Sequence, residues 1–338
     1  MPRLTDKPFI IPVEKAHKSG AIAYDEHGIG TVTHNGIEYT VTKKEQFDLT
    51  QATMFGLNER LTSTATSPQL EEGKTLRESF NTEWESYSNA FNEETGRSEY
   101  GYYVFYPHNN HLVVYVSPFW HKVVSVASSS KLYADDAGKL SWAEIREVFE
   151  SKTVGVVGCS VGGNIAHSLV MDLRPNTLKV ADKSMYKMEN INRIRLGYQD
   201  IVSSAADTTP FEIGLQNKAK VVARQMYSID PFINIYVYDE GILEENISVW
   251  FDGEGDEPPI DLVVEEVDDP RMKLLLREAA RERGIPLLMA TDIGSAVQLD
   301  INRYDLNQNL PLSYGIGDDV LRAAMESVYD NPGDRETF

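Results

Sequence analysis

The chain has a single cysteine, no histidine in its second half, fewer basic than acidic residues, and no long apolar run. Of its 338 residues only Cys159 is a cysteine, and all seven histidines lie at or before His167. A single cysteine excludes an intrachain disulfide framework and any zinc site built from several cysteines. No apolar run reaches the roughly 18 residues of a membrane helix, so we expect no membrane partner. The first residues lack a signal-peptide pattern, which favours a cytoplasmic location.

The charge balance is strongly acidic. Lysine and arginine number 32 against 52 aspartates and glutamates, which gives a formal net charge of −20. Such a surface repels nucleic acid and anionic lipid unless a local basic patch compensates, and the sequence shows no such patch. We therefore expect no nucleic-acid partner.

The most informative segment is a glycine turn. Residues 154 to 163 read V-G-V-V-G-C-S-V-G-G, an apolar run that turns at Gly158 and opens a helix. Asp182 follows at the end of the next apolar run. A strand, a glycine turn and a helix start present free N–H groups and a helix dipole to phosphates, and an acidic residue at this spacing reaches a ribose hydroxyl. The segment predicts a nucleotide site.

Strands and helices alternate from residue 153 onward. Strands are expected at 154–157, 178–181, 233–237, 262–264, 285–290 and 297–301, and helices at 164–173, 213–228 and 270–283. Asp269, Pro270 and Gly284 punctuate the last helix as N-cap, first residue and C-terminal stop. The pattern predicts an α/β fold, a Rossmann-like, mostly parallel sheet with helices on both faces.

The first part of the chain is less informative. It shows short β-like runs at 36–42, 102–106 and 111–116 but no recognisable helical pattern. The aromatic run at 102–106 is interpreted as a core strand. A polar stretch at 128–138 and a capping box formed by Ser141 and Glu144 separate this part from the alternating strands and helices that follow. We predict a smaller α+β N-terminal domain over 1–139, of unknown role, and a nucleotide-binding domain over 140–338.

The glycine turn allows two interpretations. As G-x-S-x-G it would be a nucleophile elbow with Ser160 as nucleophile, but no histidine follows to complete the usual triad order. As a dinucleotide-type G-x-G-x-x-G it has Ser160 at the middle position and Gly163 at the last. Cys159 could be a reactive thiol at a helix N-terminus, although its apolar neighbours favour a small packing residue.

The residues after Asp182 carry a family resemblance. The run D-K-S-M-Y-K-M-E-N-I-N-R, residues 182 to 193, resembles D-x-D-x-V-x-x-S-N-L-N-R of the ThiF and MoeB adenylating enzymes, relatives of ubiquitin-activating enzymes. I-G-L-Q-N-K-A-K resembles the family's Gly-x-x-Lys helix start, and D-L-V-V-E-E-V-D-D its strand ending in aspartate. Residues 261 to 306 look most like ThiF-type domains fused to nitroreductase-like domains.

The resemblance implies ATP and Mg²⁺ as cofactors and assigns roles by position. Arg193 and Lys218 would contact the phosphates, Asp268 would hold Mg²⁺, and Asp182 would bind the ribose. Asn190 would orient the phosphates or the loop that carries Arg193. Gly158, Ser160, Gly162 and Gly163 would form the phosphate turn. Seen alone, Arg193 and Lys218 would be read as solvated helix residues, and their register with the other motifs favours the phosphate role.

The chain also departs from the family. The second arginine that the family offers across a dimer has no visible match, and no cysteine stands downstream for a thioester. Three hypotheses follow. The first is MgATP-dependent adenylation of a carboxylate, on a peptide, carrier protein or small acid, without a thioester step and in the homodimer that the resemblance implies. The second is a nucleotide-binding or degenerate regulatory or scaffold module. The third is an NAD-dependent oxidoreductase.

Overall fold

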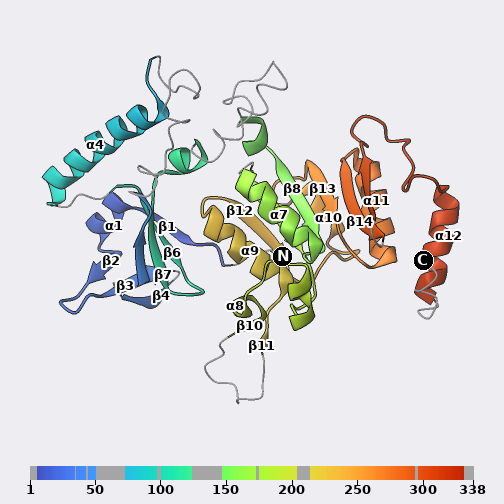
Figure 1. Ribbon diagram of the computed structural model, residues 1–338, viewed down its shortest axis with the longest axis horizontal. Coiled ribbons are helices and arrows are strands. Elements are labelled where there is room, and N and C mark those ends of the chain that lie inside the picture. Colours follow the sequence, from blue (N-terminus) through green and yellow to red (C-terminus); the bar gives the residue numbers. More distant parts are fainter. Residues whose placement is uncertain are drawn as a thin grey trace.

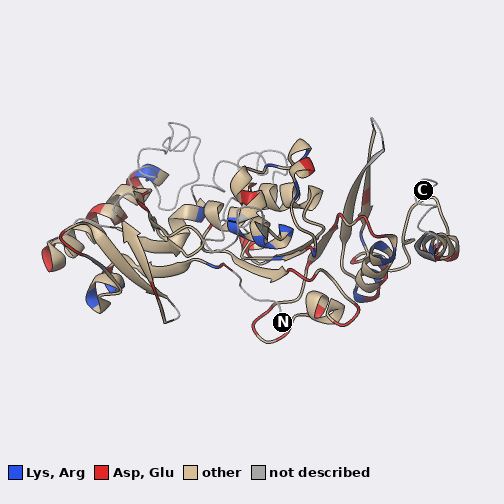
Figure 2. Cartoon of the chain, turned by 90° about the horizontal axis from the view of Figure 1, so that it is seen from below, with Lys and Arg blue, Asp and Glu red and all other residues tan. Residues whose placement is uncertain are grey.

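The computed structural model describes most of the chain as two β-rich parts joined along one core (Figure 1). The described residues are 6–34, 36–42, 45–50, 73–96, 100–123, 147–172, 175–203, 214–293 and 296–330. In Figure 2 acidic side chains are spread along the whole length of the molecule. None of the helices in these ranges is long and apolar enough to cross a membrane.

The centre of the molecule is a six-stranded sheet. Its order is β12 (Asn234–Tyr238), β9 (Thr177–Ala181), β8 (Thr153–Val157), β13 (Leu262–Glu265), β14 (Leu287–Ile293) and β15 (Ala296–Asn302). Neighbours pair in parallel from β12 to β14, and only β15 is antiparallel. From β8 the chain adds β9 and β12 on one side of the sheet and then β13 and β14 on the other, so the strand order switches between β8 and β13. Open α/β sheets bind ligands at such a switch point. The predicted Rossmann-like sheet is confirmed.

Helices cover both faces of this sheet. On one face α7 (Val161–Asp172) and α9 (Lys218–Ile229) pack against Val154 and Val156. On the other, α10 (Ile247–Asp252) and α11 (Pro270–Arg283) pack against Val157 and Val263. All five residues of β8 are buried. Because side chains alternate along a strand, they contribute to the apolar cores on both faces of the sheet. The predicted coverage of both faces is confirmed.

Two helix starts differ from the expected ones. The first helix begins at Val161 rather than at residue 164, because Gly162 and Gly163 let its first turn lie close to β8 and α9. The next begins at Lys218 rather than near 213, because the Asn217 side chain caps it by accepting from the Lys220 N–H at 3.1 Å. The Asp269 N-cap and the Gly284 stop of α11 are confirmed.

The described N-terminal part is built from strands and helices, among them a short helical segment at 118–123. A four-stranded sheet has the order β1 (Phe9–Pro12), β6 (Tyr102–Tyr106), β7 (His111–Tyr115) and β5 (Gln46–Asp48). A second sheet joins β2 (Ile22–Tyr24), β3 (Ile29–His34) and β4 (Ile37–Thr42). The other described helices are α1 (Val13–Ser19) and α4 (Leu76–Thr95). The α+β character expected for this region is present.

The helix α4 is a feature that sequence analysis missed. Its start is a capping box in which Thr75 Oγ1 accepts from the Glu78 N–H and Glu78 Oε2 accepts from the Thr75 N–H. Its apolar side is an aromatic stripe of Phe80, Trp84 and Phe91. Together with Tyr87 these rings recur at i, i+4, i+7 and i+11, so the period of an amphipathic helix was present in the sequence.

The N-terminal sheet shares a core with the central one. The Tyr106 hydroxyl donates to the Tyr227 carbonyl at 2.9 Å, and Val104 and Val113 belong to the same apolar cluster as Ile233. The run at 102–106 is thus a buried strand, as predicted. The polar stretch at 128–138, the Ser141 and Glu144 capping box and the boundary between 139 and 140 lie outside the described residues, so the two-domain division stays a prediction.

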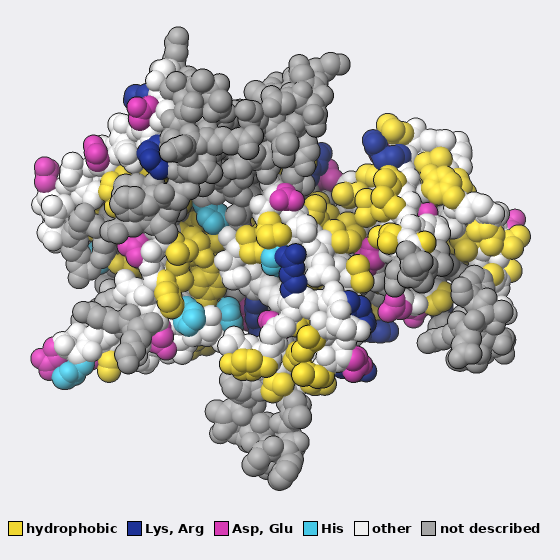
Figure 3. All heavy atoms as spheres, in the orientation of Figure 1, with side chains coloured by type: hydrophobic (Ala, Val, Ile, Leu, Met, Phe, Trp, Pro, Cys, Tyr) yellow, Lys and Arg dark blue, Asp and Glu magenta, His cyan; other side chains and the backbone are white. Residues whose placement is uncertain are grey.

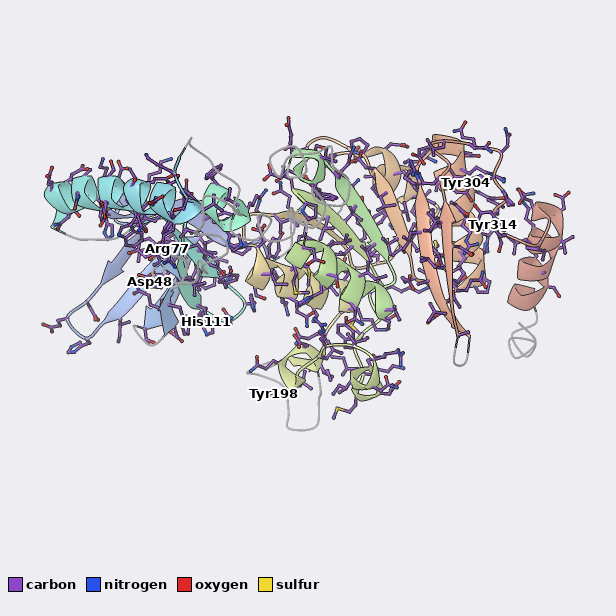
Figure 4. The ribbon with its side chains drawn as sticks, turned by 45° about the horizontal axis from the view of Figure 1, so that its top comes forward. Asp48, Arg77, His111, Tyr198, Tyr304 and Tyr314 are labelled. Carbon is purple, nitrogen blue, oxygen red and sulfur yellow. The ribbon has the colours of Figure 1, made fainter. Side chains whose placement is uncertain are left out.

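Smaller elements flank the sheet. Between β9 and α9 lie η2 (Met188–Asn192), α8 (Tyr198–Ile201) and the pair β10 (Val202–Ser203) and β11 (Gly214–Leu215). Figure 3 shows apolar side chains gathered over this segment, where Tyr198, Val202 and Leu215 are exposed. Figure 4 shows Tyr198 well away from the central sheet and Tyr314 between that sheet and α12 (Asp318–Asp330), whereas Tyr304 packs in the core with α11 and β14.

Candidate functional site

A pocket of about 240 Å³ opens at the carboxyl ends of β8, β9 and β13. Its described lining residues are Val157, Gly158, Ser160, Ala181, Asp182, Lys183, Ser184, Lys218, Gly241, Ile242, Glu266, Val267, Asp268, Asp269 and Met272. Residues from far apart in the sequence meet here because parallel strands end at the same edge of a sheet.

The turn at Gly158 requires glycine. Its φ is +87°, and a Cβ at this position would lie 2.3 Å from the carbonyl oxygen of Glu266. The Gly158 N–H donates to the Ala181 carbonyl at 2.9 Å, so the turn is held between β9 and β13. Backbone conformation and close approach both exclude a side chain here.

Asp182 fixes the glycine turn from the neighbouring strand. Its carboxylate accepts from the Cys159 N–H and from the Ser184 N–H, each at 2.8 Å. It also lines the pocket, where a carboxylate that accepts two hydrogen bonds still has lone pairs for a ribose hydroxyl. The structure therefore gives Asp182 a structural contact that the sequence did not indicate, and its contact with a ribose stays a prediction.

Cys159 is a packing residue. It is fully buried, and burial together with the nearby Asp182 carboxylate holds the pKa of its thiol well above the usual range. A thiol at this pKa is protonated at neutral pH and unreactive. Of the two interpretations of Cys159, the structure supports the buried one.

Lys218 and Ser160 meet in the pocket. The Lys218 ammonium donates to Ser160 Oγ at 3.2 Å, although 58 residues separate the two. Lys218 is the first residue of α9, and its N–H donates to the Ser184 carbonyl at 2.9 Å. A cation and a hydroxyl beside a helix N-terminus form an arrangement suited to an anion such as a phosphate.

Asn217 holds Lys218 in this place. Its side-chain amide donates to the carbonyls of Asp182 and Asp239 at 2.8 and 3.1 Å, while its oxygen caps α9. The buried amide thus ties the ends of β9 and β12 to the start of the helix that presents the lysine. Asn217 was not among the predicted site residues, although an asparagine directly before a helix is a readable N-cap signal.

The opposite wall of the pocket is acidic. Glu266, which sequence analysis did not single out, accepts from the Ala290 N–H at 3.0 Å, and burial raises the pKa of its carboxyl to about 7. Asp269 is occupied as the cap of α11, accepting from the N–H groups of Arg271 and Met272. Asp268 is exposed to the pocket. The capping role assigned to Asp269 is confirmed.

Asp268 fits the magnesium role predicted for it. Among the described residues no group of three or more His, Cys, Asp or Glu is placed to hold a metal ion. Mg²⁺ bound with nucleotide phosphates needs only one or two carboxylates, because phosphate oxygens and water complete its shell. Asp268, an exposed carboxylate that lines the same pocket as Lys218, is suited to be such a carboxylate ligand.

Arg193 and Asn190 lie outside the pocket lining. The Arg193 side chain is exposed and its guanidinium donates to Asn192 Oδ1 at 3.0 Å. Asn190 is buried, and its side chain accepts from the Lys187 N–H at 2.9 Å. Asn190 therefore shapes the loop that carries Arg193, one of the two roles expected of it, and the Arg193 carbonyl accepts from the Asn164 side chain of α7 at 3.0 Å.

Gly162 and Gly163 face the core rather than the pocket. A Cβ on Gly162 would lie 2.8 Å from Val156 Cγ1, and one on Gly163 would lie 3.1 Å from Val222 Cγ2. They let α7 approach β8 and α9, and their N–H groups belong to the first helical turn, which has no internal partners. Their predicted contact with a ligand is thus restricted to the backbone.

The nucleophile-elbow interpretation has no support in this geometry. The partner of Ser160 is an ammonium group, and no histidine is among the described residues that line the pocket. A serine nucleophile needs a neighbouring base to remove its proton.

Comparisons with known proteins agree with the sequence motifs. The model of the ThiF family matches residues 135–303. An uncharacterized protein, MT1398, of Mycobacterium tuberculosis (strain CDC 1551 / Oshkosh) is 34% identical over 178 residues, which cover 53% of this chain. The chain matches only about a fifth of that protein's length, 22%.

Solved structures resemble the chain at lower identity. E. coli tRNA N6-threonylcarbamoyladenosine dehydratase, TcdA, is 22% identical with a TM-score of 0.40, over 55% of this chain and 66% of that one. PaaA is 14% identical with a TM-score of 0.44, over 64% of each chain. TcdA in complex with ATP is 20% identical with a TM-score of 0.38, over 57% and 73%.

The family model spans half of the chain and contains the glycine turn, Asp182, Lys218 and Asp268. The similarity to domains fused to nitroreductase-like domains stays a prediction. By this match, over the segment that builds the pocket, the chain belongs to the ThiF family.

Proposed function

We propose that this protein binds MgATP in the pocket and transfers AMP to a carboxylate. The observation that carries the proposal is the meeting of Lys218 and Ser160 beside the Gly158 turn. In adenylation a substrate carboxylate oxygen attacks the α-phosphorus, and pyrophosphate leaves. The protein must therefore neutralise phosphate charge and position the two reactants.

Four pocket residues have a defined task in this proposal. The Lys218 ammonium neutralises phosphate oxygens and Ser160 adds a hydroxyl donor. Asp182 accepts from the ribose, and Asp268 would hold Mg²⁺. The metal, when bound, neutralises the charge on the leaving pyrophosphate. Because Cys159 is buried and is the only cysteine, the acyl adenylate is consumed without an enzyme thioester.

The substrate carboxylate belongs to a peptide, a carrier protein or a small acid. The net charge of −20 argues against a nucleic-acid substrate. We further propose a cytoplasmic protein that works as a homodimer, in which a second copy covers the exposed apolar side chains between β9 and α9.

A second candidate is a nucleotide-binding module without catalysis. The exposed position of Arg193 favours it, because the only basic side chains among the described lining residues are then Lys183 and Lys218. The experiment that separates the candidates is a calorimetric titration with MgATP, AMP and NADH, followed by carboxylate-dependent exchange of pyrophosphate into ATP. We expect MgATP binding together with exchange. Binding without exchange supports the module, and NADH binding alone would overturn both in favour of an oxidoreductase.

Asp268→Asn should weaken ATP binding in the presence of Mg²⁺ by about tenfold, because a neutral amide is a poor magnesium ligand. Without Mg²⁺, variant and wild type should bind ATP equally. The matched control is Asp305→Asn, whose carboxylate pairs with Arg303 at 2.6 Å outside the described pocket lining. Equal losses in both variants would show that Asp268 has no specific role.

A further inference from the structure

Tyr186 is a buried residue that the proposed reaction does not use. It follows β9, four residues after Asp182, and its side chain is 0% exposed. Its N–H donates to the Gln216 carbonyl at 2.9 Å, and its ring packs with Ile194, Ile201 and Val221.

The phenol reaches under the glycine turn. Its hydroxyl donates to the carbonyl oxygen of Cys159 at 2.9 Å in a buried contact. The N–H of the same residue donates to Asp182, so both backbone polar groups of Cys159 are held by side chains from the segment after β9. One residue of the turn is thus fixed at its donor and at its acceptor.

This hydrogen bond sets the direction of the next donor. In a planar trans peptide the C=O and the following N–H point in opposite directions. Because the Cys159 carbonyl points toward the buried Tyr186 hydroxyl, the Ser160 N–H points away from that hydroxyl, and Ser160 itself lines the pocket. If that peptide turned over, a carbonyl oxygen would face the phosphates instead.

The same ring supports the cation. The Lys218 ammonium lies 5.8 Å from the centre of the Tyr186 ring, within the range of a cation–π contact. Tyr186 therefore touches both phosphate-binding groups of the site, the turn through its hydroxyl and Lys218 through its ring.

We propose that Tyr186 is a positioning residue for phosphate recognition: it orients the Ser160 N–H into the pocket and supports the Lys218 ammonium beside it. This inference rests on the proposed MgATP site and deepens it. In this proposal Tyr186 contributes to the binding of the phosphates. It does not contribute to the binding of the nucleoside, whose ribose is proposed to contact Asp182.

Tyr186→Phe removes the hydroxyl and keeps the ring. We expect MgATP to bind about tenfold more weakly, because a buried carbonyl loses its partner and the turn loses its fixed orientation. Adenosine, which lacks phosphates, should bind within about twofold of wild type. The control is Tyr236→Phe, whose hydroxyl also donates to a backbone carbonyl, but to that of Asp256 at 2.8 Å rather than to one in the glycine turn.

Unchanged MgATP affinity in Tyr186→Phe, or an equal loss for adenosine, would overturn the inference. If the wild type binds no MgATP, the proposed function fails. The role of Tyr186 in the turn is then tested on the nucleotide-free protein. Amide exchange of Cys159, measured by NMR, should then be about tenfold faster in Tyr186→Phe than in wild type and Tyr236→Phe. Equal exchange in all three proteins would contradict the positioning role.

Discussion

Lys218→Ala should weaken MgATP binding by about a hundredfold and abolish pyrophosphate exchange. The ammonium is the charged donor beside Ser160 in the pocket, and hydrogen bonds from charged groups contribute about 1.5–3 kcal/mol. Adenosine binding should change little, because the nucleoside does not need this cation. Isothermal titration with MgATP and adenosine measures the two affinities.

The matched control for this variant is Lys220→Ala. Lys220 lies two residues further along α9, where its ammonium pairs with Asp239 Oδ2 at 2.6 Å outside the described pocket lining. We expect less than a twofold change in MgATP affinity, because this ion pair is surface-exposed. If both variants bind MgATP as wild type does, Lys218 is not a phosphate ligand. The contact between Lys218 and Ser160 then no longer supports the proposed function.

Gly158→Ala should destabilise the protein by about 3–5 kcal/mol and eliminate nucleotide binding. A Cβ would lie 2.3 Å from the Glu266 oxygen and 2.6 Å from its carbonyl carbon, and both are backbone atoms that cannot rotate away. The turn or the end of β13 must then shift, which separates Ser160 from Lys218. Urea unfolding gives the loss of stability, and titration with MgATP gives the loss of the site.

Gly255→Ala separates steric overlap from backbone strain. Gly255 also has a positive φ, +63°, but a Cβ there would meet no atom within 4 Å. A left-handed alanine costs about 1–2 kcal/mol, so this variant should lose about that much and bind MgATP normally. Equal losses of stability at both glycines would contradict the close approach of Glu266 to Gly158.

The strongest sequence signals were those in which local and tertiary preferences agree. The run from Val154 to the turn at Gly158 is buried on both faces of the sheet, so an unbroken apolar stretch was enough to indicate the strand. The helix α4 was missed although its aromatic residues recur at a helical spacing and Thr75 and Glu78 form a capping box, so local signals for it were present. Glu266 was missed because the burial that raises its pKa depends on residues distant in the chain.

Sequence by itself determined the strand, turn and helix of the phosphate-binding segment, the Rossmann-like alternation, and the family. Tertiary structure alone decided which residues meet in the pocket. Lys218 reaches Ser160 across 58 residues, whereas Arg193, in an equally convincing motif, is exposed and outside the pocket lining. Turns and helix starts are encoded by neighbouring residues. The meeting of side chains depends on strand order and packing, which bring the carboxyl ends of β8, β9 and β13 together at one edge of the sheet.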